Sequence, residues 1–309
     1  MDVRHFLHAP ARGAGRPVVA LHGSAGSGAA WRGLAGYLEG RFRVVTPDLP
    51  GYGGSPPRGR VGLAGDAAAV MELIGGIGEP VHLVGHGWGG LVALRLAVER
   101  PQAVASLTLV EPAAFHLLRA GAAADRRLYA EVMALGAAFD PAAGPARREA
   151  AMRLLVDYWN GAGAWGRTSA RLRGRLLASH DRLHGEFRAL AEEPARPGDL
   201  ARIACPTLAI MGLDSPLPSL RVTDMIAGLV PRATLRIVPD AGHMLPLTDP
   251  HLVDPMIAGH LAAADRMRRE VVPLAAWRGR AGLRSAGSAA SRRGSGCRAA
   301  GSAAGGRGG

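Results

Sequence analysis

Three glycine-rich turns in this chain each carry a histidine, the side chain most suited to general acid–base chemistry near neutral pH. The turns are Leu21-His22-Gly23, Gly85-His86-Gly87-Trp88-Gly89 and Gly242-His243-Met244. Glycines allow sharp turns from strand to helix, and the start of such a helix presents unpaired N–H groups that suit an oxyanion. The histidines would transfer protons and the N–H groups would stabilise an oxyanion, in a reaction that also requires a nucleophile.

The elements that must position these turns are predicted by short apolar runs that alternate with helical patterns. This alternation predicts βαβ units and a doubly wound, mostly parallel sheet. The runs lack polar alternation, as in strands that are covered on both faces. The expected strands are 17–22, 43–47, 81–85, 106–110, 207–211 and 234–238, with room for one short strand before Pro17. The expected helices are 28–39, 63–76, 88–99, 219–229 and 250–264.

Residues 113–200 interrupt this rhythm, because they show helical periodicity and no convincing strand. We therefore expect an α/β core formed by residues 1–112 and 201–265, with 113–200 inserted as a helical lid. Such a lid would cover the carboxyl edge of the sheet, where ligands bind in open α/β folds. Residues 266–309 are expected to form a basic Gly/Ala/Ser/Arg-rich tail.

The span from about residue 17 to 265 resembles the α/β-hydrolase superfamily through four landmarks in the family's order. They are His22-Gly23 with the loop LHGSAGSGAAW, the turn DLPGYGGS at 48–55, the run GHGWGG at 85–90, and DAGHMLPLTDP at 240–250. The third landmark resembles a nucleophile elbow, G-x-(nucleophile)-x-G, at a strand-to-helix turn. The resemblance implies an α/β-hydrolase fold and a hydrolase of small molecules.

The elbow departs from the family pattern at its central residue. The family places Ser, Cys or Asp there, and this chain has Gly87, which has no side chain that could attack a substrate. The motif differs by one residue from GHSWGG of serine hydrolases and from GHDWGG of epoxide hydrolases and haloalkane dehalogenases. The HGSAGSG loop and the absence of an H-G-x-P motif favour the serine-hydrolase branch.

The resemblance also implies roles for the residues around this vacant nucleophile position. His243 corresponds to the general base. The orienting acid is either Asp214, one residue before the usual position that Ser215 occupies here, or Glu111, since some members carry the acid on that strand. The oxyanion hole would use the backbone N–H of Trp88 and a second N–H from Ser24 or Ala25.

Three functions remain open at this point. The first is a hydrolase of the ester-hydrolysing lineage, acting on a small apolar substrate, whose activity is weak or altered without the nucleophile. The second is an enzyme without a covalent step, such as a lyase, an oxygenase or a hydrolase in which His243 activates water. The third is a ligand-binding protein without turnover. Three aromatic residues of the lid are candidates to line the pocket, or else anchor the lid's core: Tyr158, Trp159 and Trp165.

Composition excludes other classes of protein. The basic residues are all arginine, and residues 271–309 hold seven of the 37 and no acidic residue in a chain of net charge +12. Because Trp277 is the one aromatic residue of this tail, we expect a disordered extension and no nucleic-acid site. Cys205 and Cys297 make neither a disulfide framework nor a metal site. The pattern implies no cofactor, and with neither a signal peptide nor a long apolar stretch we expect a cytoplasmic protein without a membrane span.

Overall fold

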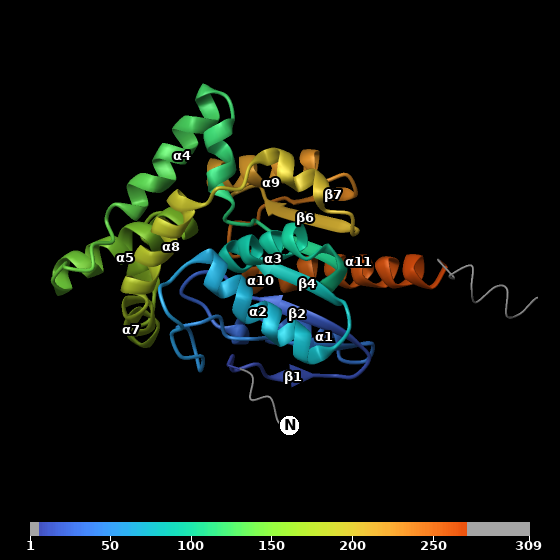
Figure 1. Ribbon diagram of the computed structural model, residues 1–309. Helices are drawn as coiled ribbons and strands as arrows, with labels where there is room; N and C mark the ends of the chain where they lie inside the picture. Colours follow the sequence, from blue (N-terminus) through green and yellow to red (C-terminus); the bar gives the residue numbers. More distant parts are fainter. Residues whose placement is uncertain (1–5, 271–309) are drawn as a thin grey trace, which may run out of the picture. The chain divides into compact units, whose positions relative to one another are not determined.

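The computed structural model describes residues 6–270, with side chains through residue 267. Within them the chain forms a seven-stranded sheet of order β1-β3-β2-β4-β5-β6-β7 (Figure 1). The strands are β1 (Ala11–Arg12), β2 (Arg16–Leu21), β3 (Phe42–Val45), β4 (Val81–His86), β5 (Val104–Val110), β6 (Thr207–Gly212) and β7 (Ala233–Val238). Strand β1 pairs antiparallel with β3, and the other neighbours are parallel, which confirms the predicted mostly parallel sheet.

Helices cover both faces of the sheet, as the uninterrupted apolar strands predict. Alternate residues of a strand enter different cores: Val19 and Leu21 of β2 pack on one side, and Val18 and Ala20 on the other. The first core is completed by α2 (Leu63–Ile77), α3 (Gly87–Glu99) and α9 (Leu217–Leu229), and the second by α1 (Arg32–Leu38) and α11 (Pro250–Glu270).

The helix boundaries differ from the predicted ones at two places. The predicted helix 28–39 is divided into a 3-10 turn η1 (Gly28–Trp31) and α1. Helix α11 continues to Glu270, so the first residues of the predicted tail are helical. The remainder of that tail, from residue 271, lies outside the described residues. One compact unit of the chain ends at Ala264.

Five helices lie between β5 and β6, in the segment that is predicted as an insertion. They are α4 (Ala123–Gly136), α5 (Pro145–Asn160), α6 (Ala164–Arg167), α7 (Ala170–Ala178) and α8 (His180–Glu192), preceded by the turn η3 (Phe115–Ala120). Figure 1 shows α4, α5, α7 and α8 grouped to one side of the strands. Their small apolar core contains Phe139, Met152, Leu155 and Trp165. These helices therefore fold partly on one another.

Candidate functional site

The turn from β4 to α3 places Gly87 at the carboxyl edge of the sheet. Helix α3 begins at Gly87, whose φ of 53° lies in the left-handed region that L-residues rarely adopt. A Cβ atom built at this position would lie 3.5 Å from Gly23 Cα and 3.8 Å from His243 Nε2, which are ordinary contact distances. A small side chain at residue 87 would thus have room and would face the imidazole of His243.

His243 follows β7 at the same edge, and its other ring nitrogen meets Glu111. The Nδ1–H group of His243 donates to Glu111 Oε2 over 2.7 Å. Glu111 is fully buried at the end of β5, and its Oε1 accepts hydrogen bonds from Ser215 Oγ at 2.5 Å and the Gly212 N–H at 2.9 Å. Burial alone would raise the pKa of Glu111, but these hydrogen bonds, that of His243 foremost, outweigh it and lower the pKa. The carboxylate is therefore held ionised against the imidazole.

The two carboxylates predicted as alternatives lie in different environments. Asp214 is exposed, and its backbone N–H donates to the Ala241 carbonyl at 2.9 Å, which fixes the turn after β6. The described contacts place Glu111, and not Asp214, in hydrogen bond with His243. Ser215, which occupies the usual acid position, donates its hydroxyl to Glu111. Ser215 thus occupies the usual position of the acid, and the carboxylate that meets His243 is Glu111, directly after β5.

Two further histidines hold the turns around the site. His86 Nε2–H donates to the His243 carbonyl at 3.0 Å, and the two rings lie 4.8 Å apart. His22 Nδ1–H donates to the Gly23 carbonyl at 2.8 Å, and its Nε2 accepts from the Leu49 N–H at 3.0 Å. Burial lowers the pKa of His86 to about 3 and that of His22 to about 4, so both rings stay neutral at pH 7.

The backbone segments that are predicted to supply an oxyanion hole flank Gly87. Trp88 is in the first turn of α3, where backbone N–H groups lack intrahelical partners. The loop after β2 is tied to this turn, because the Gly89 N–H donates to the His22 carbonyl at 3.1 Å. In that loop Ala25 has a φ of 55°. Ser24 and Ala25 remain the two candidates for the second donor.

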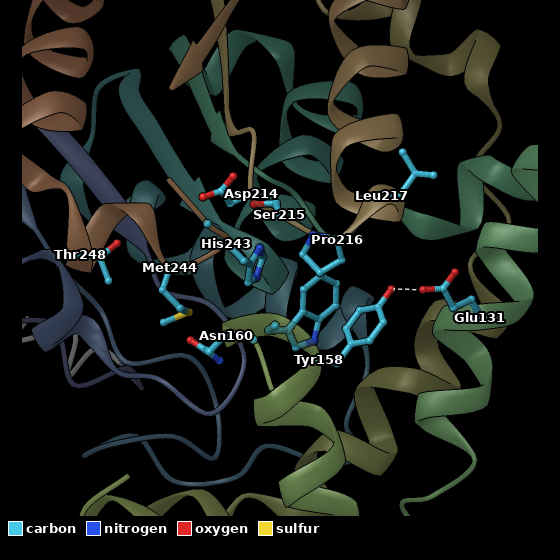
Figure 2. A pocket seen from close by; sticks show the side chains of 13 residues that line it. Glu131, Tyr158, Asn160, Asp214, Ser215, Pro216, Leu217, His243, Met244 and Thr248 are labelled. Atoms are coloured by element: carbon cyan, nitrogen blue, oxygen red, sulfur yellow. Dashed lines mark hydrogen bonds between the residues drawn. The ribbon is translucent and has the colours of Figure 1, made fainter. Parts of the chain in front are cut away.

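A cavity of about 650 Å³ opens beside His243 (Figure 2). Its walls include Trp159 and Tyr158 from the end of α5, and Pro216, Leu217 and Met244 from the core. The Trp159 ring lies 4.5 Å from the His243 ring, and the Tyr158 hydroxyl donates to Glu131 over 2.5 Å.

Trp165 does not line this cavity, although the sequence makes it a candidate. Its side chain is buried in the core of the inserted helices, beside Met152 and Leu155. The backbone N–H of Trp165 also donates to Asp157 Oδ1 at 2.7 Å. Trp165 therefore anchors the inserted helices, which is the other role considered for it.

Sequence reasoning missed a buried polar cluster beside the loop after β2. It consists of Tyr52, Asp66, Arg182 and Glu186, each less than a tenth exposed. The sequence carries one sign of it, because Arg182 and Glu186 are four residues apart and can pair along one helix face. Nothing in that pattern indicates that the pair is buried against the core. Within the described residues no cluster of His, Cys, Asp and Glu could hold a metal ion, and no helix is long and apolar enough to cross a membrane.

Comparison with known proteins gives matches along most of the chain. The sequence model of the family described as "alpha/beta hydrolase fold" matches residues 16–250. A putative carbamate hydrolase RutD of Variovorax paradoxus is 29% identical over 262 residues, which are 81% of this chain and 92% of that protein. A pimeloyl-[acyl-carrier protein] methyl ester esterase of Methylococcus capsulatus is 44% identical over 98 residues, and this match spans only 37% of the esterase and 32% of this chain.

A solved structure shows the same fold. The crystal structure of a hydrolase from Pseudomonas aeruginosa PA01 superposes with a TM-score of 0.68 at 24% identity. The superposition covers 82% of this chain and 94% of that one.

Proposed function

The chain belongs to the α/β-hydrolase family, and on that premise we propose that it descends from hydrolases of small esters and retains their site without the nucleophile. The observation that carries this proposal is the position of the His243 imidazole. Its Nε2 lies 3.8 Å from the place where a Cβ of residue 87 would be, while its Nδ1 donates to Glu111. Base and acid are thus aligned on a residue that has no side chain, so ester hydrolysis is weak or altered.

In this proposal His243 is the general base and Glu111 is the acid that orients it. The acid needs only to hold the imidazole and to balance its charge after proton transfer. The backbone N–H of Trp88 and that of Ser24, or else of Ala25, stabilise the oxyanion. The core of residues 1–112 and 201–265 carries these groups, and residues 113–200 form the lid.

The substrate is a small ester with an apolar portion. This substrate assignment is supported by the cavity beside His243, whose walls combine the apolar side chains of Trp159, Leu217 and Met244 with at least as many polar residues. The two relatives described above are named for acyl compounds, an ester in one and a carbamate in the other. A carbonyl carbon attached to a leaving heteroatom is common to both.

A second candidate follows from the same alignment. With no side chain at residue 87, a water molecule could occupy the position that faces His243 Nε2, and His243 would deprotonate it. The intact pairing of His243 with Glu111 favours this candidate over a protein that only binds a ligand, because the pairing has no evident use in binding alone.

The decisive experiment replaces Gly87 with serine and, as a matched control, with alanine. Both changes add the same Cβ at ordinary contact distances and carry the same cost of a positive φ, and only serine adds a hydroxyl. We expect Gly87→Ser to hydrolyse p-nitrophenyl esters at least about 10²-fold faster than the natural protein and to be labelled by a fluorophosphonate, since a nucleophile multiplies residual catalysis. Gly87→Ala should show neither effect. A folded serine variant that gains no turnover and takes no label would rule out the proposal.

The natural protein distinguishes the second candidate. If water is the nucleophile, the unmodified chain hydrolyses the same esters, and His243→Ala abolishes that activity. If the rate is the same with and without His243, the natural site does not use the imidazole, and ligand binding becomes the remaining function.

A further inference from the structure

A buried group of charged side chains links helix α8 to the core beneath it. Arg182 and Glu186 lie one turn apart on α8, with Arg182 Nε 3.3 Å from Glu186 Oε1. Arg182 also donates through Nη2 to Asp66 of α2, and its guanidinium lies 5.1 Å from the centre of the Tyr52 ring. All four side chains are buried, so each charge must find its partners within this group.

Glu186 connects this group to the loop after β2. Its Oε2 accepts a hydrogen bond from Ser24 Oγ at 2.6 Å, and its Oε1 accepts one from the Tyr52 hydroxyl at 2.9 Å. Burial raises the pKa of Glu186 to about 7, against the lowering effects of Arg182 and of the Ser24 hydrogen bond. The loop that would supply one oxyanion donor is therefore tied to α8 through a single carboxylate.

Asp66 connects the same group to the other donor segment. Its Oδ2 accepts a hydrogen bond from the Trp88 indole Nε1–H at 2.8 Å as well as the contact from Arg182. Trp88 directly follows Gly87, and its backbone N–H is the other proposed oxyanion donor. Arg182 thus joins both donor segments, through Asp66 on one side and through Glu186 on the other.

We infer that Arg182 and Glu186 of the inserted helices are positioning residues for the oxyanion hole, holding the Ser24 and Trp88 segments at a fixed separation. Oxyanion donors act only when their positions are fixed before charge develops, so a buried network across both segments supplies the needed rigidity. Stability alone does not account for this network, because a well-packed apolar cluster could give equal stability without these hydrogen bonds. This inference rests on the proposed function, because it assigns a partner to the proposed oxyanion hole.

The kinetic test uses the Gly87→Ser chain with Glu186→Ala, and Glu193→Ala as the control. Glu193 follows α8, is equally buried and pairs with Arg95 at 2.8 Å, but contacts neither donor segment. We expect Glu186→Ala to lower kcat by about 10–10²-fold with KM within about threefold, since misplaced donors weaken only the transition state. Glu193→Ala should leave both constants within about threefold. Glu186→Gln keeps the shape and one acceptor oxygen, and should regain most of kcat.

A second measurement on the natural Gly87 chain separates this inference from the proposed function. Amide hydrogen exchange over residues 22–26 should accelerate by about tenfold or more in Glu186→Ala and remain unchanged in Glu193→Ala, because of these two carboxylates only Glu186 hydrogen bonds to that loop. Equal exchange in the two variants would overturn the inference whatever the kinetics. Faster exchange with an unchanged kcat in the serine background would overturn the positioning role. A serine variant without any activity would overturn the proposed function, while exchange still reports whether Glu186 holds the loop.

Discussion

Residues with a strained, left-handed backbone conformation lie around the candidate site. Between residues 6 and 270, three residues other than glycine have a positive φ: Ala25 at 55°, Glu111 at 42° and Asp240 at 54°. Each follows a strand at the carboxyl edge of the sheet, and Gly87, with a φ of 53°, shares that edge. Such a conformation costs an L-residue about 1–2 kcal/mol, and it persists where the surroundings hold it. At residue 87 glycine removes that cost together with the nucleophile.

The first prediction concerns the two carboxylates in the Gly87→Ser background. Glu111→Gln should lower kcat for ester hydrolysis by about 10²–10⁴-fold, because the imidazole loses the partner that sets its tautomer. Asp214→Asn should change kcat by less than about threefold, since its side chain is exposed and does not hydrogen bond to His243. Steady-state kinetics with the folded variants measure both. Equal losses from the two changes would mean that Glu111 is not the orienting acid.

Among the elements, a close backbone approach occurs where the elbow meets β2. A Cβ added at Gly89 of α3 would lie 2.5 Å from the carbonyl oxygens of Leu21 and His22. Both contacts are with backbone of a central strand, which cannot move without breaking its pairing with β3 and β4. The helix therefore approaches the sheet as closely as it does only because residue 89 has no side chain.

The second prediction compares two glycines that are both inside helices. Gly89→Ala should lower the free energy of unfolding by about 1–3 kcal/mol, because the added methyl group overpacks the junction with β2. Gly75→Ala in α2, where a Cβ meets nothing within 4 Å, should raise it by about 0.5–1 kcal/mol through higher helix propensity. Urea denaturation monitored by circular dichroism gives both values. Similar effects of the two changes would contradict the packing argument.

For the molecule as a whole, a sheet covered on both faces requires that buried polar groups be neutral or paired. Three of the buried histidines and the half-buried His260 meet this requirement by remaining neutral. Burial lowers the pKa of His22 and His260 to about 4 and that of His86 and His116 to about 3. Because the unfolded chain takes up these protons near pH 6.5, acid below that pH favours unfolding until the folded protein is protonated as well.

The third prediction isolates one of these histidines. His116 is 3% exposed, and its Nδ1 has no hydrogen-bond partner, so leucine can replace it without leaving a polar group unpaired. Between pH 6 and pH 4, the free energy of unfolding of the natural protein should fall more steeply than that of His116→Leu, by up to about 1.4 kcal/mol per pH unit. His251→Leu, a change at an exposed position of α11, should keep the pH dependence of the natural protein. Parallel curves for His116→Leu and the natural protein would show that His116 is protonated in the folded state.

Local sequence patterns were sufficient for the elements and for the fold. The bounds of each predicted strand lie within two residues of those of an observed strand. Apolar runs of strand length and helical periodicity indicate which residues are buried, and every β/α packing requires such buried faces. The elbow was recognisable in part for a similar reason, since the glycine at residue 85 is required by backbone contacts with Gly89 and Gly90, close to it in the chain. The glycine at residue 89 is required by Leu21 and His22, which only the tertiary structure brings near.

The partners of the side chains required the tertiary structure. His243 meets Glu111 across 132 residues of sequence, Ser215 meets Glu111 across 104, and Glu186 meets Ser24 across 162. Such contacts depend on strand order and on how the inserted helices return to the core, and local sequence periodicity predicts neither of these. The sequence therefore predicts a vacant nucleophile position at Gly87 in an α/β-hydrolase fold. The packing of β4, β5 and β7 brings the imidazole and its carboxylate together beside it.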